Sequence, residues 1–280
     1  MTYKIESASE FLRSMVAKHK PVAVLVGVSG GYDSLVTAHL TLTAIPGAEC
    51  FHINTGIGIE RTRQFVRDTC KDRGWPLTEV MPEDHSGMTY REMVLKHGFP
   101  GPGSHSFMYR NLKERGIRYL VREKKRGHSR NSRVLIVTGV RSDESSRRRI
   151  NVGREQKIGA QIWVAPIMDF TAGDKMRYVK NHSLPRNPVA DTLGMSGECL
   201  CGAFAHKGEK SLVRLVCPQT ANQIDALEKE VASRGWPWPW EGKPTAAAIR
   251  EKHGQGSLFR PMCVGCEKTE DERFKRELLG

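Results

Sequence analysis

Two groups of residues in this sequence have types and spacings that could carry chemistry. The first is the stretch SGGYDS, residues 29–34, which follows an apolar run and precedes a helical pattern. Glycines lack Cβ, so backbone N–H groups there can approach an anion, and the N-terminus of the following helix directs more N–H groups and its dipole to the same place. Two serines add hydroxyl donors. The stretch matches neither G-x-x-x-x-G-K-[ST] nor G-x-G-x-x-G, yet it predicts a phosphate-binding loop.

Cysteines at short spacing form the second group. A C-x-C pair ends at residue 201 and a C-x-x-C pair begins at residue 263, with residues 202–262 between them. Four thiolates can close tetrahedrally around Zn²⁺ or hold an Fe–S cluster, and free thiols or a redox disulfide would fit the same pattern. C-x-C is less usual in a zinc ribbon, where C-x-x-C pairs dominate. Cys217 could replace one ligand, whereas Cys50 and Cys70 fall in a predicted strand and helix and are expected to be core thiols. The predicted ligands are Cys199, Cys201, Cys263 and Cys266.

Charge is unevenly distributed along the chain. The 280 residues carry a formal charge of +13, and residues 110–133 hold ten basic residues against two acidic ones, with three further arginines at 147–149. Such a field attracts polyanions, nucleotide or nucleic acid, although a solvated charged face is the simpler alternative. No apolar stretch approaches the roughly 20 residues of a membrane span, and the N-terminus lacks a signal-peptide core. We therefore expect a soluble, cytoplasmic protein with no membrane partner.

The elements that must position these residues alternate along the chain. Apolar runs predict strands at residues 22–29, 48–55, 77–82, 133–141 and 162–170, and helical patterns fall at 5–19, 34–44, 59–74, 89–97, 106–126, 171–181 and 219–234. This alternation predicts an α/β fold with a doubly wound, mostly parallel sheet covered on both faces. In such a sheet ligands bind beyond the carboxyl ends of the strands, which is where SGGYDS falls.

The pattern changes after about residue 185, where the sequence becomes rich in Pro, Gly and Cys. Residues 184–204 are expected to be loop-like, and residues 235–244, GWPWPWEGKP, to form a rigid aromatic linker. We expect two units: a nucleotide-binding α/β domain over residues 1–190 and a small helical and loop module over residues 191–280 that carries the cysteine cluster.

Several motifs in order resemble the phosphoadenosine phosphosulfate reductase family of the PP-loop ATP pyrophosphatases, over most of residues 20–205. SGGYDS resembles the family's S-G-G-x-D-S loop, and HINTGIGIERTRQFV (52–66) its second-strand motif, with Asn54 where an acid usually stands. YRNLKERGI (109–117), TGVRSDESSRRR (138–149) and APIMDFTAGDKMRYVKNHSLPRNPVADTLG (165–194) resemble further family segments. The chain looks close to the branch that acts in DNA phosphorothioation.

The resemblance implies roles for individual residues. Phosphate would be bound by Ser29, Gly30, Gly31, Asp33 and Ser34. Thr55 and Gly56 would lie by the nucleoside. Phosphate or substrate would be surrounded by Lys113, Arg141, Glu144, Ser145 and Arg148. The catalytic residues would be Asp33, Lys113, Arg141 and Glu144.

The resemblance also bears on cofactors. Asp33 could orient Mg²⁺ beside ATP, or could only compensate the helix dipole. For the cysteines the resemblance favours a [4Fe–4S] cluster over Zn²⁺. His52 is expected to be a core or rim histidine rather than part of the site.

The predicted function is an ATP-using sulfurtransferase that adenylates an acceptor, DNA or tRNA, and takes sulfur from a donor such as a cysteine desulfurase. The basic helix 106–126 and the tryptophans at 236, 238 and 240 would supply phosphate contacts and stacking surfaces, although simple packing would also explain the tryptophans. An alternative is a phosphoadenylyl sulfate or adenylyl sulfate reductase using an external thiol, because the tail CEKTEDERFKRELLG lacks the E-C-G-[IL]-H nucleophile segment of the assimilatory reductases. A second alternative is a catalytically silent nucleotide or nucleic-acid binding module.

Overall fold

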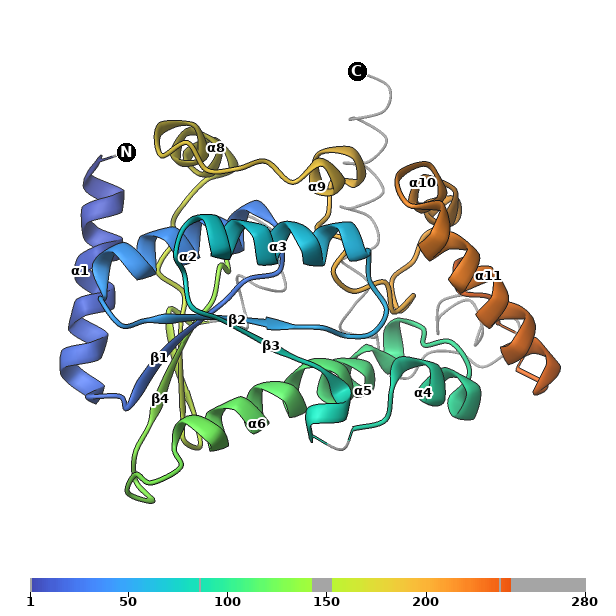
Figure 1. Ribbon diagram of the computed structural model, residues 1–280, viewed down its shortest axis with the longest axis horizontal. Coiled ribbons are helices and arrows are strands. Elements are labelled where there is room, and N and C mark those ends of the chain that lie inside the picture. The colour runs from blue at the N-terminus through green and yellow to red at the C-terminus, as the bar shows by residue number, and fades with distance from the viewer. Residues whose placement is uncertain (1, 86, 143–152, 237, 243–280) are drawn as a thin grey trace, which may run out of the picture.

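The computed structural model describes residues 2–85, 87–142, 153–236 and 238–242, which are drawn in colour in Figure 1. A six-stranded sheet with the order β3-β2-β1-β4-β6-β5 forms its centre. The neighbouring pairs run parallel except β5 and β6, which are antiparallel. The strands are β1 (Ala23–Gly27), β2 (Glu49–Ile53), β3 (Leu77–Val80), β4 (Val134–Val137), β5 (Glu155–Ile158) and β6 (Gln161–Val164). The mostly parallel α/β fold predicted from the sequence is confirmed.

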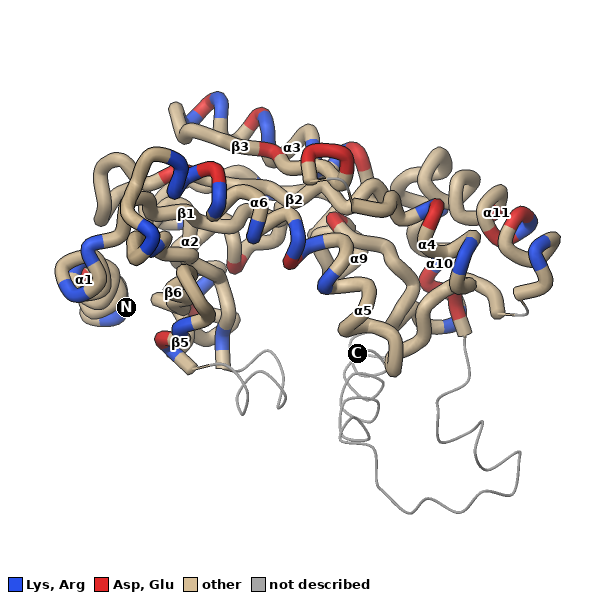
Figure 2. The backbone as a smooth tube through the Cα atoms, turned by 90° about the horizontal axis from the view of Figure 1, so that it is seen from below, with Lys and Arg blue, Asp and Glu red and all other residues tan. Residues whose placement is uncertain are grey.

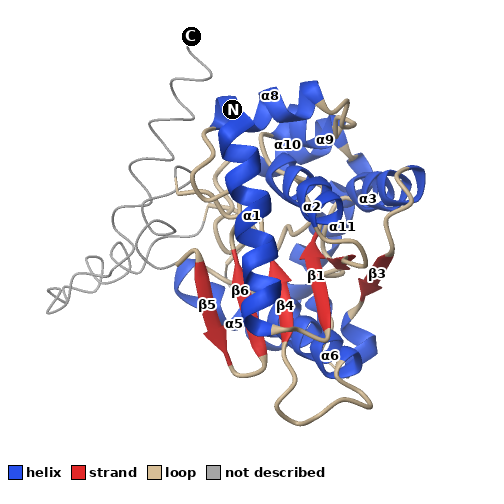
Figure 3. Cartoon of the chain, turned by 90° about the vertical axis from the view of Figure 1, so that its left-hand side faces the viewer, coloured by secondary structure: helices blue, strands red, loops and turns tan. Residues whose placement is uncertain are grey.

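Helices cover both faces of the sheet (Figures 1 and 3). One face packs in a single apolar cluster with helices α1 (Thr2–His19), α2 (Tyr32–Ala44), α3 (Glu60–Asp72) and α8 (Ala172–Asn181). The other face packs against α6 (Arg115–Lys124). Within β1, Val24 and Val26 enter the first cluster and Leu25 the second, as the two-residue period of a strand requires. Because both sides are buried, these strands appear in the sequence as continuous apolar runs.

A third apolar cluster joins the C-terminal part of the chain to the middle of it. It packs α10 (Glu209–Val216) and α11 (Pro218–Ser233) against α4 (Tyr90–His97) and α5 (His105–Tyr109). Trp240, in the segment expected to be an aromatic linker, is 1% exposed and its indole N–H donates to the carbonyl of Leu200 at 2.8 Å, so packing, the simpler alternative for the tryptophans, is confirmed at this residue. This tryptophan anchors the chain on the segment that carries Cys199 and Cys201. The division into units at residues 190 and 191 stays a prediction.

The structure differs from the sequence expectation at strand β5, at helices α9 and α10, and at a π turn. Strand β5 was not expected, because Glu155–Ile158 is mostly exposed and contains no apolar run, and it pairs with β6 through its backbone. Helices α9 (Pro188–Leu193) and α10 were also missed, since α9 has six residues and α10 eight, too few for a clear helical period. The helix expected at 106–126 is continuous but contains a π turn, Arg110–Glu114, between α5 and α6. No helix in the described parts of the chain is long and apolar enough to cross a bilayer.

Candidate functional site

The sheet contains a point at which the order of the strands reverses. From β1 the chain passes to β2 on one side, and it later returns to β4 on the other side. In sheets of this kind ligands bind at such a point, beyond the carboxyl ends of the strands, where the loops that leave β1 and β4 lie. Both loops carry predicted site residues and they touch: a Cβ on Gly139 would lie 2.7 Å from the carbonyl oxygen of Asp33.

Residues 29–34, the phosphate loop, are held in shape by their neighbours. Gly30 has φ +80°, and a Cβ there would lie 2.5 Å from Cγ2 of Thr62. The buried side chain of Asn187 donates from Nδ2 to the carbonyl oxygen of Gly30 at 2.9 Å. Gly31 is the N-cap of α2, so the first turn of that helix begins at the loop. At Gly30, therefore, the backbone conformation and the lack of space both exclude a larger residue.

The serine hydroxyls close the phosphate loop from within. The backbone N–H of Ser29 donates to Oγ of Ser34 at 3.1 Å, and that hydroxyl donates to the carbonyl oxygen of Gly31 at 2.8 Å. The hydroxyl of Ser29 donates to Oγ of Ser34 at 3.2 Å. Both hydroxyls therefore lie together at the N-terminus of α2, where the helix dipole favours an anion.

Asp33 lies between two cations. Its Oδ1 accepts from Nε of Arg141 at 2.5 Å, and its Oδ2 accepts from Nζ of Lys175 at 3.2 Å. The side chain of Arg141 is 6% exposed, so this ion pair is largely withdrawn from water. Lys175, in the first turn of α8, was not singled out from the sequence; its place directly after the D-F-T segment was the available signal. A role for Asp33 at Mg²⁺ stays a prediction.

Asn54 replaces the family's usual acid at the end of β2 and organises the turn that follows. Its Oδ1 accepts from the N–H of Gly56 at 3.0 Å, and its Nδ2 donates to Oε1 of Glu79 at 2.8 Å. The guanidinium of Arg67 holds the pKa of Glu79 below its usual value. A carboxylate is therefore present here, supplied by β3 instead of β2.

Thr55 and His52 lie inside the protein beneath this turn. Thr55 is fully buried and donates to the carbonyl oxygen of Glu198 at 3.2 Å, so its hydroxyl faces the segment that carries the cysteines. His52 is 2% exposed and its Nδ1 contacts the carbonyl oxygen of Val28 at 2.7 Å, which agrees with a core histidine. The predicted nucleoside contacts of Thr55 and Gly56 stay predictions.

Residues 196–201, the cysteine segment, lie along the loop that follows β2. The two backbones approach so closely that a Cβ on Gly58 would lie 2.1 Å from the carbonyl oxygen of Glu198. The segment also reaches the phosphate loop, since a Cβ on Gly31 would lie 3.6 Å from Cβ of Ser196. Three hydrogen bonds fix the segment: Thr62 Oγ1 to Ser196 O at 2.6 Å, Ile59 N to Gly197 O at 2.8 Å, and Leu200 N to Ile57 O at 2.7 Å.

Lys113 and Glu198 form an ion pair beside the thiols. Nζ of Lys113 donates to Oε2 of Glu198 at 2.7 Å, and the Glu198 side chain is 5% exposed. Burial disfavours the charge on Lys113, but the carboxylate of Glu198 and the thiol group of Cys199 outweigh this and raise the pKa of the ammonium above its ordinary value. Oε1 of Glu198 is buried without a hydrogen-bond partner among the described residues. The sequence analysis did not single out Glu198 as a site residue.

The thiols of Cys199 and Cys201 are close enough to share a hydrogen bond. That bond, followed by burial, raises the pKa of the Cys199 thiol well above its ordinary value, so this thiol must lose its proton when it binds a metal. The hydroxyl of Tyr90 donates to the carbonyl oxygen of Cys201 at 3.0 Å and fixes the backbone here.

The predicted four-cysteine set is only partly described. Two of the thiols lie side by side, which fits one half of a four-thiolate site, and within the described residues no group of three or more His, Cys, Asp or Glu could hold a metal ion. Cys50 and Cys70 are 0% and 1% exposed, so their prediction as core thiols is confirmed. The predicted residues Glu144, Ser145, Arg148, Cys263 and Cys266 lie outside the described residues.

Besides the buried Trp240, a second group of aromatic side chains, not expected from the sequence, lies on segments close in sequence to Cys201 and Lys113. His105, Tyr109 and Phe204 form an aromatic cluster, with ring centroids 4.8 Å apart for His105 and Phe204 and 6.3 Å apart for His105 and Tyr109. Tyr109 is 41% exposed and Phe204 is 40% exposed. Phe204 lies three residues after Cys201, and Tyr109 lies one helical turn before Lys113. The cluster joins two segments that are about 95 residues apart, and no local sequence pattern predicts such a meeting.

One protein-family domain matches the part of the chain that forms the sheet. The phosphoadenosine phosphosulfate reductase domain matches residues 23–193, more than half of the chain and the whole of the parallel sheet with both of its loops. The chain belongs to this family. The solved phosphoadenylyl-sulfate reductase of Candida auris, in complex with phosphate, is 18% identical with a TM-score of 0.50, over 66% of this chain and 84% of that one, and shows the same fold.

Two curated relatives of this family member come from archaea. An uncharacterised protein of Methanocaldococcus jannaschii is 25% identical over 85% of this chain and 49% of its own length. The tRNA-5-methyluridine(54) 2-sulfurtransferase of Pyrococcus horikoshii is 42% identical over 79 residues, which are 28% of this chain and 26% of that protein. The chain thus spans about half the length, or less, of the curated relatives it matches.

Proposed function

We propose that the protein is an ATP-dependent sulfurtransferase that adenylates an acceptor on a nucleic acid and then replaces the activated oxygen by sulfur. The observation that carries the proposal is the contact between the phosphate loop and the cysteine segment, where a Cβ on Gly31 would lie 3.6 Å from Cβ of Ser196. Cys199 follows Ser196 by three residues. The backbone segment that carries the two thiols therefore lies against the loop that is predicted to hold phosphate.

The phosphate loop would bind the nucleotide through its bare backbone and the N-terminus of α2. To donate to phosphate oxygens, the hydroxyls of Ser29 and Ser34 would turn their single protons away from Ser34 Oγ and from the carbonyl oxygen of Gly31. Arg141 and Lys175 bring two positive charges to Asp33, and the excess charge would compensate the phosphates. Mg²⁺ would be held by Asp33 together with the phosphates and would supply further charge neutralisation.

The reaction would proceed in two displacements. An acceptor oxygen attacks the α-phosphorus of ATP, a new P–O bond forms, the bond to the bridging oxygen breaks, and pyrophosphate leaves. A sulfur nucleophile then attacks the activated centre, and AMP leaves with the acceptor oxygen. Loop amides and cations held in place before the reaction stabilise the charge that develops on phosphorus oxygens.

Cys199 and Cys201, together with the predicted ligands Cys263 and Cys266, would hold a [4Fe–4S] cluster, with Zn²⁺ as the alternative. Two adjacent thiols are available there as ligands, and the buried Oε1 of Glu198 has no hydrogen-bond partner among the described residues. Both features fit a bound polar group such as a cluster or a metal ion. A cluster bound there would supply the binding site from which sulfur is delivered. Lys113 would keep Glu198 neutralised and the cysteine segment in position.

The acceptor is proposed to be a nucleic acid because the aromatic cluster includes Phe204, three residues after Cys201, and Tyr109, one helical turn before Lys113. Exposed aromatic rings bind unpaired bases by stacking, at about 1–3 kcal/mol per base. The Pyrococcus relative, named as a tRNA sulfurtransferase, is consistent with this choice. The sulfur donor would be a separate protein such as a cysteine desulfurase.

Two assays on anaerobically purified protein test the proposal. ATP with nucleic acid should release pyrophosphate, and Ser29→Ala should lower that rate at least tenfold, whereas Ser211→Ala, an exposed serine on α10, should leave it unchanged. A second candidate, favoured by the family match itself, is reduction of phosphoadenylyl sulfate. Sulfite formed from that compound, with no pyrophosphate formed from ATP, would overturn the proposal in favour of the reductase. If neither product forms, the protein is a binding module and the proposal fails.

A further inference from the structure

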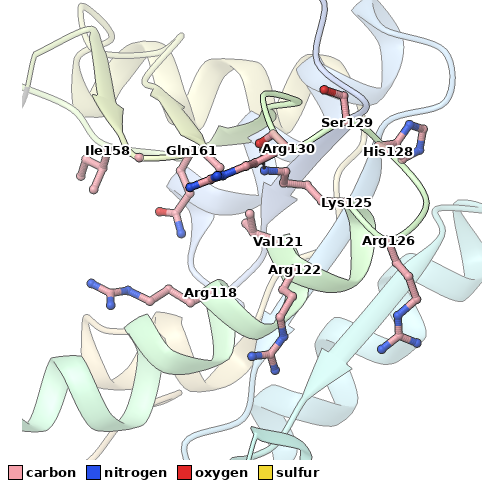
Figure 4. Close-up of a pocket in the computed structure, with 12 residues that line it drawn as sticks. Arg118, Val121, Arg122, Lys125, Arg126, His128, Ser129, Arg130, Ile158 and Gln161 are labelled. Carbon is pink, nitrogen blue, oxygen red and sulfur yellow. Dashed lines mark hydrogen bonds between the residues drawn. The ribbon is translucent and has the colours of Figure 1, made fainter.

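A pocket of about 670 Å³ lies at the opposite edge of the sheet from the phosphate loop. Its walls are the later turns of α6, the loop that follows them and the turn between β5 and β6 (Figure 4). This edge carries the beginning of β4, whereas the candidate site lies at the carboxyl ends of the strands. The basic residues that line this pocket, the basic pocket, are Arg118, Arg122, Lys125, Arg126, His128 and Arg130.

Positive charge in the basic pocket is only partly compensated. None of the described residues that line it is acidic. Arg118 pairs with Glu114 and Arg126 with Glu123, both on the same helical segment. Arg122, Lys125 and Arg130 form no ion pair with a described carboxylate; Nζ of Lys125 donates to the carbonyl oxygen of Arg130 at 2.9 Å. Concave surfaces with excess charge of one sign focus the field on an approaching ion.

The framework of the basic pocket is fixed by the core of the sheet. Nη1 of Arg133 donates to the carbonyl oxygen of Gly159 at 2.9 Å and ties the loop after α6 to the β5–β6 turn. Val121 packs in the core beneath the pocket, whereas Ile158 remains 47% exposed at its wall. In Figure 4, Arg118 and Arg122 project from α6 while Arg130 comes from the loop. The pocket therefore offers cations together with an apolar wall.

We propose that the basic pocket binds the phosphate backbone of the nucleic-acid substrate, away from the reactive edge. The identity of the ligand rests on the proposed function. From Lys113, which pairs with Glu198 next to Cys199, to Lys125, which lines the basic pocket, the helix axis spans about 18 Å at 1.5 Å per residue. A polynucleotide can contact both places at once, whereas a small acceptor molecule reaches only one.

Nucleic acid fits the basic pocket better than an acidic protein does. The cations are mostly guanidinium groups, whose fork of donors matches two oxygens of one phosphate. The spacing of Arg118 and Arg122, four residues on one helix, is about 6 Å along the axis, on the order of two nucleotide steps of 3.4 Å. The exposed side chain of Ile158 would face sugar rather than a carboxylate.

The test compares the double variant Arg122→Ala/Arg130→Ala with Arg61→Ala/Lys71→Ala, which removes two exposed cations from α3 on the other face of the sheet (Figure 1). Figure 2 shows that basic and acidic residues are interspersed along α3. The probes are a mixed transfer RNA and a single-stranded DNA, titrated against the full-length protein over a range of salt concentrations. The pocket variant should raise Kd about 10-fold or more and reduce the slope of log K against log salt by about 1.4–1.8, while the α3 variant leaves both near wild type.

Four other results would overturn the proposal or separate it from the proposed function. Unchanged Kd and slope in the pocket variant would refute the site. Competition by polyglutamate that equals competition by RNA at the same ionic strength would assign the pocket to an acidic protein instead, and would refute it as well. Kd of ATP should be unchanged in the pocket variant, and a loss of ATP binding would show a general disturbance and refute the assignment. If no pyrophosphate is released but the pocket variant still shows the reduced salt slope, the proposed reaction is wrong and the proposed pocket is supported.

Discussion

Gly30 is the position in the phosphate loop where a side chain is least tolerated. Its φ of +80° is unfavourable for any residue with a Cβ, and that atom would lie 2.5 Å from Cγ2 of Thr62. Gly30→Ala should therefore lower the free energy of unfolding by about 1–3 kcal/mol, since both strain and overlap contribute. ATP binding should weaken at least tenfold because the loop must shift. Urea denaturation and calorimetric titration with ATP measure the two effects.

Gly31→Ala is the matched control for Gly30→Ala. Gly31 has φ −85°, and its added Cβ would meet Ser196 at an ordinary distance of 3.6 Å. Its unfolding free energy should remain within about 0.5 kcal/mol of wild type, as for a substitution without strain. Equal destabilisation by the two alanines would contradict the account of the loop.

Lys113 and Glu198 depend on each other for stability. Lys113→Met would leave the Glu198 side chain, 5% exposed, with neither oxygen partnered among the described residues. Breaking a buried pair on one side costs about 3–5 kcal/mol, and the 30% exposure of Lys113 reduces the expected loss here to about 2–4 kcal/mol. Denaturant unfolding of the metal-free protein measures this loss.

A double-mutant cycle separates this coupling from other effects of Lys113. Adding Glu198→Gln to Lys113→Met removes the uncompensated charge. The double variant should therefore lose about 1–3 kcal/mol less unfolding free energy than the sum of the losses in the two single variants. Strictly additive losses would show that the ion pair contributes nothing beyond packing.

At the scale of elements, segments with a buried apolar run or a clear helical period were predictable, whereas an exposed strand and very short helices were not. Strand β4, Val134–Val137, is buried at every residue and its apolar run was apparent in the sequence. Strand β5 was not, because its residues are exposed and its position depends on pairing with β6. Helix α9 depends on a cap, because the side chain of Asn187 accepts a hydrogen bond from the N–H of Val189. A search for helical periodicity does not detect such a cap.

The packing of α2 against α8 contains a titratable group, His39. Its Nδ1 contacts the hydroxyl of Tyr178 at 2.8 Å, and burial, followed by the positive charges of His182 and Arg73, lowers its pKa to about 4. The unfolded chain, with a histidine pKa of about 6.5, takes up a proton before the folded protein does. Stability from this group is therefore complete above pH 6.5 and is lost as pH falls toward 4, by about 2–3 kcal/mol.

His39→Gln tests this pH dependence, because glutamine keeps a polar group toward Tyr178 and does not titrate. Carboxylates titrate in the same range in both proteins, so the informative quantity is the difference between variant and wild type. Between pH 7.5 and 4.5 the variant should lose about 2 kcal/mol less unfolding free energy than wild type does. His128→Gln, at an exposed position, should show no such difference. If the His39 and His128 variants behave alike, burial of His39 is not the cause.

At the scale of the whole molecule, the sequence motifs mark segments that the fold brings together, but they do not show how those segments meet. Ser29 and Ser34 lie together at the N-terminus of α2 after β1, as expected from the motif. Lys175 and Glu198 joined the site only through the fold, since their partners Asp33 and Lys113 are far away in the chain. Contacts over such separations depend on how helices and loops pack, and a single sequence carries no local signal for them.

The arrangement of two remote surfaces on one molecule predicts how affinity depends on substrate length. The aromatic cluster includes Tyr109, one helical turn before Lys113, and the basic pocket includes Lys125, about 18 Å along the helix axis from Lys113. At 3.4 Å per nucleotide, a single strand needs about five or more nucleotides to engage both, and linked contacts then raise affinity beyond either alone.

Single strands of about 4, 8 and 20 nucleotides, measured by fluorescence anisotropy at constant salt, test this expectation. Wild-type affinity should rise more than about tenfold between the two shorter lengths and change little afterwards. Either Tyr109→Ala/Phe204→Ala or Arg122→Ala/Arg130→Ala should remove most of that rise, because each leaves only one surface, while Arg61→Ala/Lys71→Ala should preserve it. A smooth increase with length that is the same in all four proteins would mean that the strand binds at many equivalent places, and the two-surface account would then be wrong.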